Sequence, residues 1–81
     1  MKVLKFSATW CAPCKMLSAM LKADEFKNIE IEEIDVDDKR DYAISMGVRN
    51  VPTLIVMDGD VEQRRTTGSK TKQQLMEFLG L

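Results

Sequence analysis

The pattern of hydrophobic and polar residues predicts four β-strands along the chain. Residues 2–8 contain a short apolar stretch, and residues 29–36 begin with the alternation Ile-Glu-Ile-Glu, which is typical of a half-buried strand. Residues 53–57 are a continuous apolar run, as expected for a strand covered on both faces. Asp58-Gly59 separates this run from residues 61–66, which predicts a tight hairpin between the last two strands.

Apolar positions at helical spacing predict three helices between and after these strands. Pro13 suits the first turn of the first helix, where a missing N–H has no cost. The second helix is preceded by aspartates and is expected to end at Gly47. Ser69 or Thr71 caps the third helix, and Thr71 with Gln74 has the spacing of a capping box. The apolar positions are Met16, Leu17, Met20 and Leu21 in the first helix, Tyr42, Ile44 and Met46 in the second, and Leu75, Met76, Phe78 and Leu79 in the third.

The resulting element order is β-α-β-α-β-β-α, which indicates an α/β fold. The first two strands are expected to be parallel, joined by a right-handed crossover, and the last two antiparallel through the hairpin. Eighty-one residues leave no room for a second core, so a single domain over residues 1–81 is expected.

Composition excludes several classes of partner. Twelve basic and 13 acidic residues give a net charge of −1, so electrostatics favours neither nucleic acid nor an anionic membrane. No apolar run approaches the roughly 20 residues of a membrane span, and no secretion signal is recognisable at the start. A monomer in the cytoplasm is therefore expected.

Cys11 and Cys14 are the most informative residues for chemistry. They are the only cysteines, and the chain has no histidine. A zinc site needs about four ligands, so this pair would have to recruit carboxylates or a second molecule. A disulfide between them closes too short a loop to stabilise the fold much. Reversible thiol–disulfide exchange is therefore the leading hypothesis, and an iron–sulfur cluster shared between two chains is an alternative.

The position of the pair at a predicted helix start gives the two thiols different roles. A helix N-terminus stabilises a thiolate, and the thiolate is the reactive form of cysteine. Cys11 lies just before the helix and is assigned as the attacking thiolate, whereas Cys14, one turn later, is assigned as the resolving thiol. Trp10 next to the pair is either a core aromatic or, as we favour, an apolar contact surface. Pro52 immediately precedes a buried strand, and from the local sequence alone it fits a residue that simply starts the strand.

Several motifs in register resemble the thioredoxin family over about residues 3–81. They are W-C-x-P-C-K at 10–15, I-D-V-D at 34–37, G-V-R-N-V-P-T at 47–53, D-G at 58–59 and T-G at 67–68. The resemblance implies a thioredoxin-like fold with a four-stranded mixed sheet, strand order 2-1-3-4, and helices on both faces. Thioredoxins usually carry a further strand and helix at the front, for which this chain has no residues. It is therefore similar to a thioredoxin of glutaredoxin size.

The resemblance also implies roles for individual residues. Cys11 would be the exposed nucleophile, Cys14 the buried resolver and Pro52 a cis-proline packed against the disulfide. Ala12 and Asn50 stand where many thioredoxins have glycine. The rim of a groove for an extended client peptide would be formed by Trp10, Ala12, Pro13, Val51 and Gly68, with the Val51 backbone as the pairing edge.

Lys5 and Glu33 depart from the family pattern beneath the cysteines. Thioredoxins usually have a buried aspartate at the position of Lys5 and a lysine on the neighbouring strand, where Glu33 stands, so the signs are exchanged. Strand alternation places both residues on otherwise apolar faces. Either each side chain reaches past the sheet into solvent, or the two pair near Cys14. As a pair, Lys5 would favour the thiolate of Cys14 and Glu33 would accept its proton.

The family resemblance implies a protein-disulfide reductase with no bound cofactor beyond its redox-active disulfide. A thioredoxin reductase would recycle it, and disulfide-containing proteins such as a ribonucleotide reductase would be its clients. A glutathione-dependent enzyme of the glutaredoxin type is the main alternative, although Ala12-Pro13 and residues 67–70 lack that family's usual residues. A scaffold that merely keeps the fold is a further alternative, against which the retention of both cysteines argues.

Overall fold

The computed structural model describes all residues, 1–81, and contains the predicted elements in the predicted order. A short 3₁₀ helix, which the sequence pattern did not distinguish from the end of the first helix, is added after α1. The elements are β1 (Lys2–Ser7), α1 (Ala12–Met20), η1 (Asp24–Phe26), β2 (Glu30–Asp35), α2 (Arg40–Ser45), β3 (Thr53–Asp58), β4 (Val61–Thr67) and α3 (Lys72–Leu79). That the 81 residues act as one domain stays a prediction.

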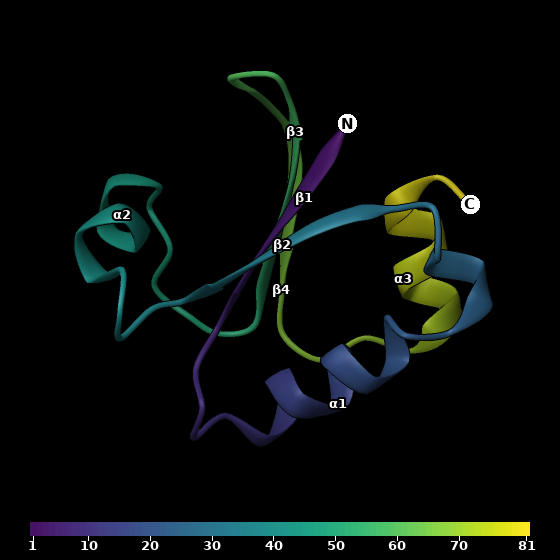
Figure 1. The fold of residues 1–81 in the computed structure, drawn as a ribbon, viewed down its shortest axis with the longest axis horizontal. Helices are drawn as coiled ribbons and strands as arrows, with labels where there is room; N and C mark the ends of the chain where they lie inside the picture. The colour runs from purple at the N-terminus through teal and green to yellow at the C-terminus, as the bar shows by residue number, and fades with distance from the viewer.

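The four strands form one mixed sheet in the order β2-β1-β3-β4, which confirms the expected topology. β1 is central: it pairs in parallel with β2 and antiparallel with β3, and β3 pairs antiparallel with β4. α1 and α3 lie together on one side of the sheet and α2 lies on the other, as Figure 1 shows. The sheet is therefore covered on both faces, as expected.

Each face of the sheet has its own apolar core. On the side of α1 and α3 the core is formed by Val3, Leu17, Phe26, Leu54, Val56, Leu75 and Leu79. On the side of α2 it is formed by Leu4, Phe6, Ile34, Ala43 and Ile55. Alternation along β1 assigns successive residues to opposite cores, and the same alternation puts Lys5 on the side of α1.

The helix ends follow local sequence chemistry. Thr71 accepts a hydrogen bond from the Gln74 N–H, and the Gln74 side chain accepts one from the Thr71 N–H, so the predicted capping box is formed. Gly47 follows the last residues of α2 with a φ of +71°, a conformation that glycine adopts without strain.

Two details differ from the sequence-based expectation. The hairpin turn is Gly59-Asp60 rather than Asp58-Gly59, because Asp58 still pairs with Val61. In α2 Ala43 is the buried residue, whereas Ile44 is exposed and Tyr42 is partly covered, with its ring centroid 5.8 Å from that of buried Phe6. Because α2 has only six residues, Val36, Met46 and Val48 from the flanking segments also pack against this core.

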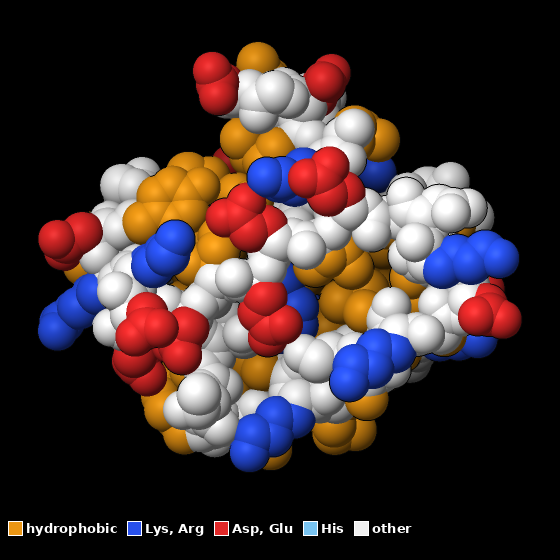
Figure 2. Space-filling model, in the orientation of Figure 1, with side chains coloured by type: hydrophobic (Ala, Val, Ile, Leu, Met, Phe, Trp, Pro, Cys, Tyr) orange, Lys and Arg blue, Asp and Glu red, His pale blue; other side chains and the backbone are white.

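Acidic and basic side chains are interspersed over the face shown in Figure 2, without one large patch of a single sign. None of the helices has the length and apolar character that crossing a membrane requires.

Candidate active site

Cys11 and Cys14 lie where the chain passes from β1 into α1, and they form a disulfide with a Cα–Cα distance of 5.2 Å. Cys11 is the N-cap of α1: its Sγ accepts a hydrogen bond from the Cys14 N–H at 3.2 Å. The first turn of α1 contains Pro13 and no acidic residue. The helix therefore directs an unopposed backbone donor at the Cys11 sulfur.

Cys14 is buried, as the family resemblance implied, but Cys11 is more enclosed than expected. Cys11 is 5% exposed and Cys14 is 2% exposed, so the expected exposed nucleophile lies only slightly nearer to solvent than its partner. The two sulfur-bearing side chains cluster with Ala8, while Val36 and Val51 pack against the group. These apolar neighbours and α1 together account for the low exposure of the two cysteines.

The loop before β3 borders the disulfide and is held at several points. The Val51–Pro52 peptide bond is cis, and Pro52 is buried. The Pro52 carbonyl accepts a hydrogen bond from the Gly68 N–H at 2.9 Å, which joins this loop to the loop before α3. The Thr53 hydroxyl donates to the Asn50 carbonyl at 2.6 Å. By contrast, the N–H and C=O of Val51 have no partner in the molecule, which leaves them open to an incoming chain.

Trp10 directly precedes Cys11 and is 69% exposed, so it is not a core aromatic, and its role as a contact surface stays a prediction. Its indole N–H donates to Asp37 Oδ2 at 3.0 Å. This bond ties the residue before Cys11 to the loop that follows β2, and it fixes the orientation of a ring that solvent would otherwise leave free.

The residues expected to form the groove rim come from the start of α1 and from the loops before β3 and before α3. Ala12 and Pro13 are exposed on the first turn of α1, Gly68 is exposed before α3, and Val51 is half-buried. A pocket of about 340 Å³ opens at two of them, Trp10 and Val51; it is lined by Trp10, Val36, Val48, Arg49, Asn50 and Val51. Arg49 and Val48 were not singled out from the sequence, because only the fold places this loop against Trp10.

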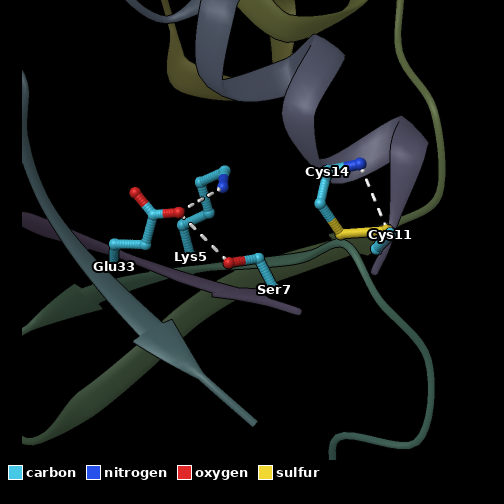
Figure 3. Close-up of polar contacts among 5 residues, drawn as sticks. All are labelled: Lys5, Ser7, Cys11, Cys14 and Glu33. Atoms are coloured by element: carbon cyan, nitrogen blue, oxygen red, sulfur yellow. Dashed lines mark hydrogen bonds and ion pairs between the residues drawn. A yellow bond between two sulfur atoms is a disulfide. The ribbon is translucent and has the colours of Figure 1, made fainter. Parts of the chain in front are cut away.

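Lys5 and Glu33 are paired, as Figure 3 shows. They are direct neighbours in the β1–β2 register, and Lys5 Nζ lies 3.0 Å from Glu33 Oε1. The Lys5 side chain is 2% exposed, whereas that of Glu33 is 62% exposed, because β2 is an edge strand. Ser7, which sequence reasoning missed, donates its hydroxyl to the same carboxylate oxygen at 3.2 Å.

This pair shares a pocket with Cys14. Lys5, Ser7, Cys14, Ser18 and Glu33 are all among the residues that line a polar pocket of about 330 Å³ between β1, β2 and α1. No hydrogen bond joins Cys14 to Lys5 or Glu33, so any influence of the pair on the sulfur acts across this pocket. Ser7 lies two residues after Lys5 on β1, so the strand alternation that placed Lys5 on this face could also have identified Ser7.

The electrostatics of the pair are set mainly by Lys5. Its hydrogen bond lowers the pKa of Glu33, its charge and the Ser7 hydroxyl act in the same direction, and partial burial opposes them. A carboxyl with a lowered pKa is a weaker proton acceptor. This direction works against the predicted role of Glu33 as the base for Cys14.

No three side chains of the metal-binding types His, Cys, Asp and Glu are grouped closely enough to hold a metal ion. The reactive group present in the molecule is the disulfide itself.

Comparison with known proteins decides the family. The family model named Thioredoxin matches residues 1–80. The chain belongs to the thioredoxin family. It is 32% identical over 78 residues to the thioredoxin of Mycoplasma genitalium, covering 94% of this chain and 76% of that protein. It is 35% identical to part of a bifunctional thioredoxin reductase/thioredoxin of Mycobacterium leprae, covering 95% of this chain and 18% of that protein.

Solved structures agree with this assignment. Thioredoxin NaTrxh from Nicotiana alata superimposes with a TM-score of 0.85 at 35% identity, covering 95% of this chain and 68% of that one. Thioredoxins are protein-disulfide oxidoreductases, and this thioredoxin has its cysteine pair at the expected place with a disulfide formed. The protein is therefore a thiol–disulfide oxidoreductase that works by dithiol exchange.

Proposed function

We propose that this thioredoxin reduces disulfides of client proteins, with Cys11 as the nucleophile and Cys14 as the resolving thiol. The Cys11 thiolate attacks one sulfur of the client disulfide; that S–S bond breaks, and the other client sulfur leaves as a thiolate. The Cys14 thiolate then attacks Cys11 Sγ, which releases the second client sulfur and forms the Cys11–Cys14 disulfide. The client gains two electrons and the protein loses two.

The hydrogen bond from the Cys14 N–H to Cys11 Sγ is the observation that carries this division of roles. In the reduced protein the same N–H stabilises a thiolate on Cys11, which is the state that attacks. Cys14 has no corresponding donor from the helix N-terminus and is the more enclosed of the two, which suits a thiol that acts only on a sulfur already bound next to it.

We assign Lys5 as a positioning residue for the second step. Its ammonium lies inside the polar pocket that Cys14 borders, and positive charge there favours the Cys14 thiolate. Glu33 holds Lys5 in place from the solvent side, and Ser7 orients the Glu33 carboxylate. In this proposal the Lys5 cation, which stands where thioredoxins usually have an aspartate, stabilises the Cys14 thiolate directly. No carboxylate then has to accept the proton of Cys14.

The groove residues are proposed to bind the client as an extended chain. The unpaired N–H and C=O of Val51 can form strand-like hydrogen bonds with a client backbone. Trp10 offers an exposed apolar surface, and Ala12, Pro13 and Gly68 are likewise exposed and available for contact with the client. The cis Val51–Pro52 bond sets the direction of this loop next to the disulfide.

Recycling by a thioredoxin reductase is proposed because a relative joins the two activities in one bifunctional chain. We further propose that the protein acts as a monomer in the cytoplasm, without a bound cofactor. Disulfide-containing enzymes, a ribonucleotide reductase among them, are its proposed clients.

Insulin reduction with two alternative recycling systems tests the proposal. We expect turnover with NADPH and a thioredoxin reductase, and little turnover with glutathione and glutathione reductase. Turnover with glutathione alone would instead support the glutaredoxin-type alternative.

Two cysteine variants test the order of attack. Cys14→Ser should accumulate a stable mixed disulfide with insulin, because the resolving thiol is missing, whereas Cys11→Ser should form none. Equal trapping by both variants would overturn the assignment of the nucleophile.

A further inference from the structure

A pocket beside the disulfide combines apolar walls with one cation. Trp10, Val36, Val48 and Val51 supply its apolar lining, and Arg49 with Asn50 supplies the polar part. Val36 and Val51 also pack against the cysteine cluster, so the pocket continues directly from the disulfide. A client whose disulfide reaches Cys11 must therefore place neighbouring side chains at this pocket.

Arg49 has no partner within the molecule. It forms no ion pair and no side-chain hydrogen bond, and it is exposed. Two other arginines are engaged: Arg65 pairs with Glu62 and donates to the Met46 carbonyl, while Arg64 donates to the Phe78 carbonyl. Arg40 on α2 has no partner either, but it does not line this pocket. A guanidinium left free at the edge of an apolar pocket retains its full capacity to bind a carboxylate.

Asp37, in the loop that follows β2, forms no ion pair with Arg49. Its carboxylate accepts the hydrogen bond from the indole of Trp10, which lines the pocket. The side-chain amide of Asn50 is likewise unpartnered; the only recorded hydrogen bond of this residue is through its backbone carbonyl. The pocket margin therefore presents unused donors from two consecutive residues.

We propose that Arg49, assisted by the Asn50 amide, selects clients that carry an acidic side chain close to the target cysteine. This inference rests on the proposed function, since it names the kind of client that the groove receives. A client chain paired with Val51 places its adjacent residues next to Arg49, two positions earlier in the same loop. The methylenes of a client glutamate would lie on the apolar lining while its carboxylate meets the guanidinium.

The size of the effect follows from the exposure of the site. Exposed ion pairs contribute modestly, which corresponds to about a two- to fivefold preference in rate. Because such charges also steer the encounter, the preference should appear mainly in the bimolecular rate constant and should fall as salt is added.

Three model peptides that differ at a single position provide the test. Each carries one cysteine as a mixed disulfide with thionitrobenzoate, and glutamate, glutamine or lysine stands two residues from it. Attack of the Cys11 thiolate on the peptide sulfur releases thionitrobenzoate, which is followed by absorbance. We expect the reduced wild-type protein to react about two- to fivefold faster with the glutamate peptide than with the lysine peptide.

Variants assign the preference to Arg49. Arg49→Gln should abolish the preference and Arg49→Glu should reverse it. Lys27→Gln is the control, because it removes one positive charge at the opposite end of β2 from the disulfide, and it should keep the wild-type preference. A glutamate preference that survives in Arg49→Gln would overturn the inference, as would equal wild-type rates on all three peptides. Failure of the wild type to release thionitrobenzoate from any peptide would instead count against the proposed function.

Discussion

Lys5 is closed off from solvent while Glu33, its ion-pair partner on the neighbouring strand, is open to it. The buried member of the pair is thus the cation, 3.0 Å from a carboxylate that water also reaches. A buried charge is costly unless it is paired, so Lys5 depends on Glu33 more than Glu33 depends on Lys5. Unequal consequences of substituting the two residues follow from this arrangement.

The free energy of unfolding should be more sensitive to loss of Glu33 than to loss of Lys5. Glu33→Gln removes the negative charge and leaves the ammonium with a weaker acceptor, which should cost about 1–2 kcal/mol. Lys5→Met replaces the ammonium with an apolar group in an enclosed position and should be close to neutral. Urea unfolding of both variants measures this, and a larger loss in Lys5→Met would contradict it.

Acid should remove the stability that Glu33 contributes. Its pKa is lowered in the folded protein, chiefly by the hydrogen bond from Lys5, with contributions from Ser7 on β1 and from the charge of Lys22 after α1. A carboxyl whose pKa is lowered by folding stabilises the fold at pH values above its pKa in the unfolded chain, about 4.3. This contribution is lost as the pH falls through the pKa of the folded protein. The stability difference between wild type and Glu33→Gln should therefore be constant near neutral pH and shrink below about pH 4. A difference that grows on acidification would reverse the assigned sign.

The pH dependence of the second reaction step, resolution of the mixed disulfide by Cys14, tests the proposed role of Lys5. If Lys5 stabilises the Cys14 thiolate, Lys5→Met should shift the pH profile of mixed-disulfide resolution to higher pH, with little change in the alkaline limit. The first step, thionitrobenzoate release by Cys11, should keep its profile and serves as the internal control. Stopped-flow measurement of both steps over pH checks this, and an unshifted second step would leave Lys5 with a structural role only.

Asp37 should control the mobility of the single tryptophan, Trp10. Asp37→Ala removes the acceptor of the indole N–H, so the fast component of the fluorescence anisotropy decay should grow. Asp37→Asn keeps a carbonyl acceptor and should stay close to wild type. Unfolding free energies should change by no more than about 0.5 kcal/mol, because both residues are exposed. Identical decays in all three proteins would show that other contacts fix the ring.

The capping box should make a measurable contribution to α3. Thr71→Ala removes the hydroxyl that accepts from the Gln74 N–H, and it should lower the free energy of unfolding by about 1 kcal/mol. Gln74→Ala removes only the reciprocal bond to the Thr71 N–H and should cost less. Thermal or urea unfolding compares the two variants, and an equal or larger loss in Gln74→Ala would contradict the order.

Much of the fold was predictable from the sequence because local and long-range signals agree. The apolar run at residues 53–57 is a covered strand as predicted, and of the two expected caps, Ser69 and Thr71, the structure has Thr71 at the start of α3. The turn position was missed by one residue, since Asp58-Gly59 and Gly59-Asp60 are equally plausible by composition. The pairing register of β3 with β4, which extends to Asp58 and Val61, decides between them.

The site was predictable to the extent that its parts are close in sequence or follow strand alternation. Cys11 and Cys14 at a helix start, and Lys5 and Glu33 on one sheet face, fall into this class. Arg49 could not be recognised in the same way. Its distinguishing property is its place, without an internal partner, in the pocket beside Trp10, and both are known only once the fold has placed the neighbouring loops.

The position of β2 at the rim of the sheet has a consequence for self-association. Edge strands offer unpaired backbone groups to other chains, and charged side chains are a common protection against such contacts. Here Glu30, Glu32, Glu33 and Asp35 occupy four of the six positions of this strand. Two copies meeting along this rim would bring rows of like charge together, so repulsion opposes fibril-like stacking at neutral pH and weakens once the carboxylates are protonated.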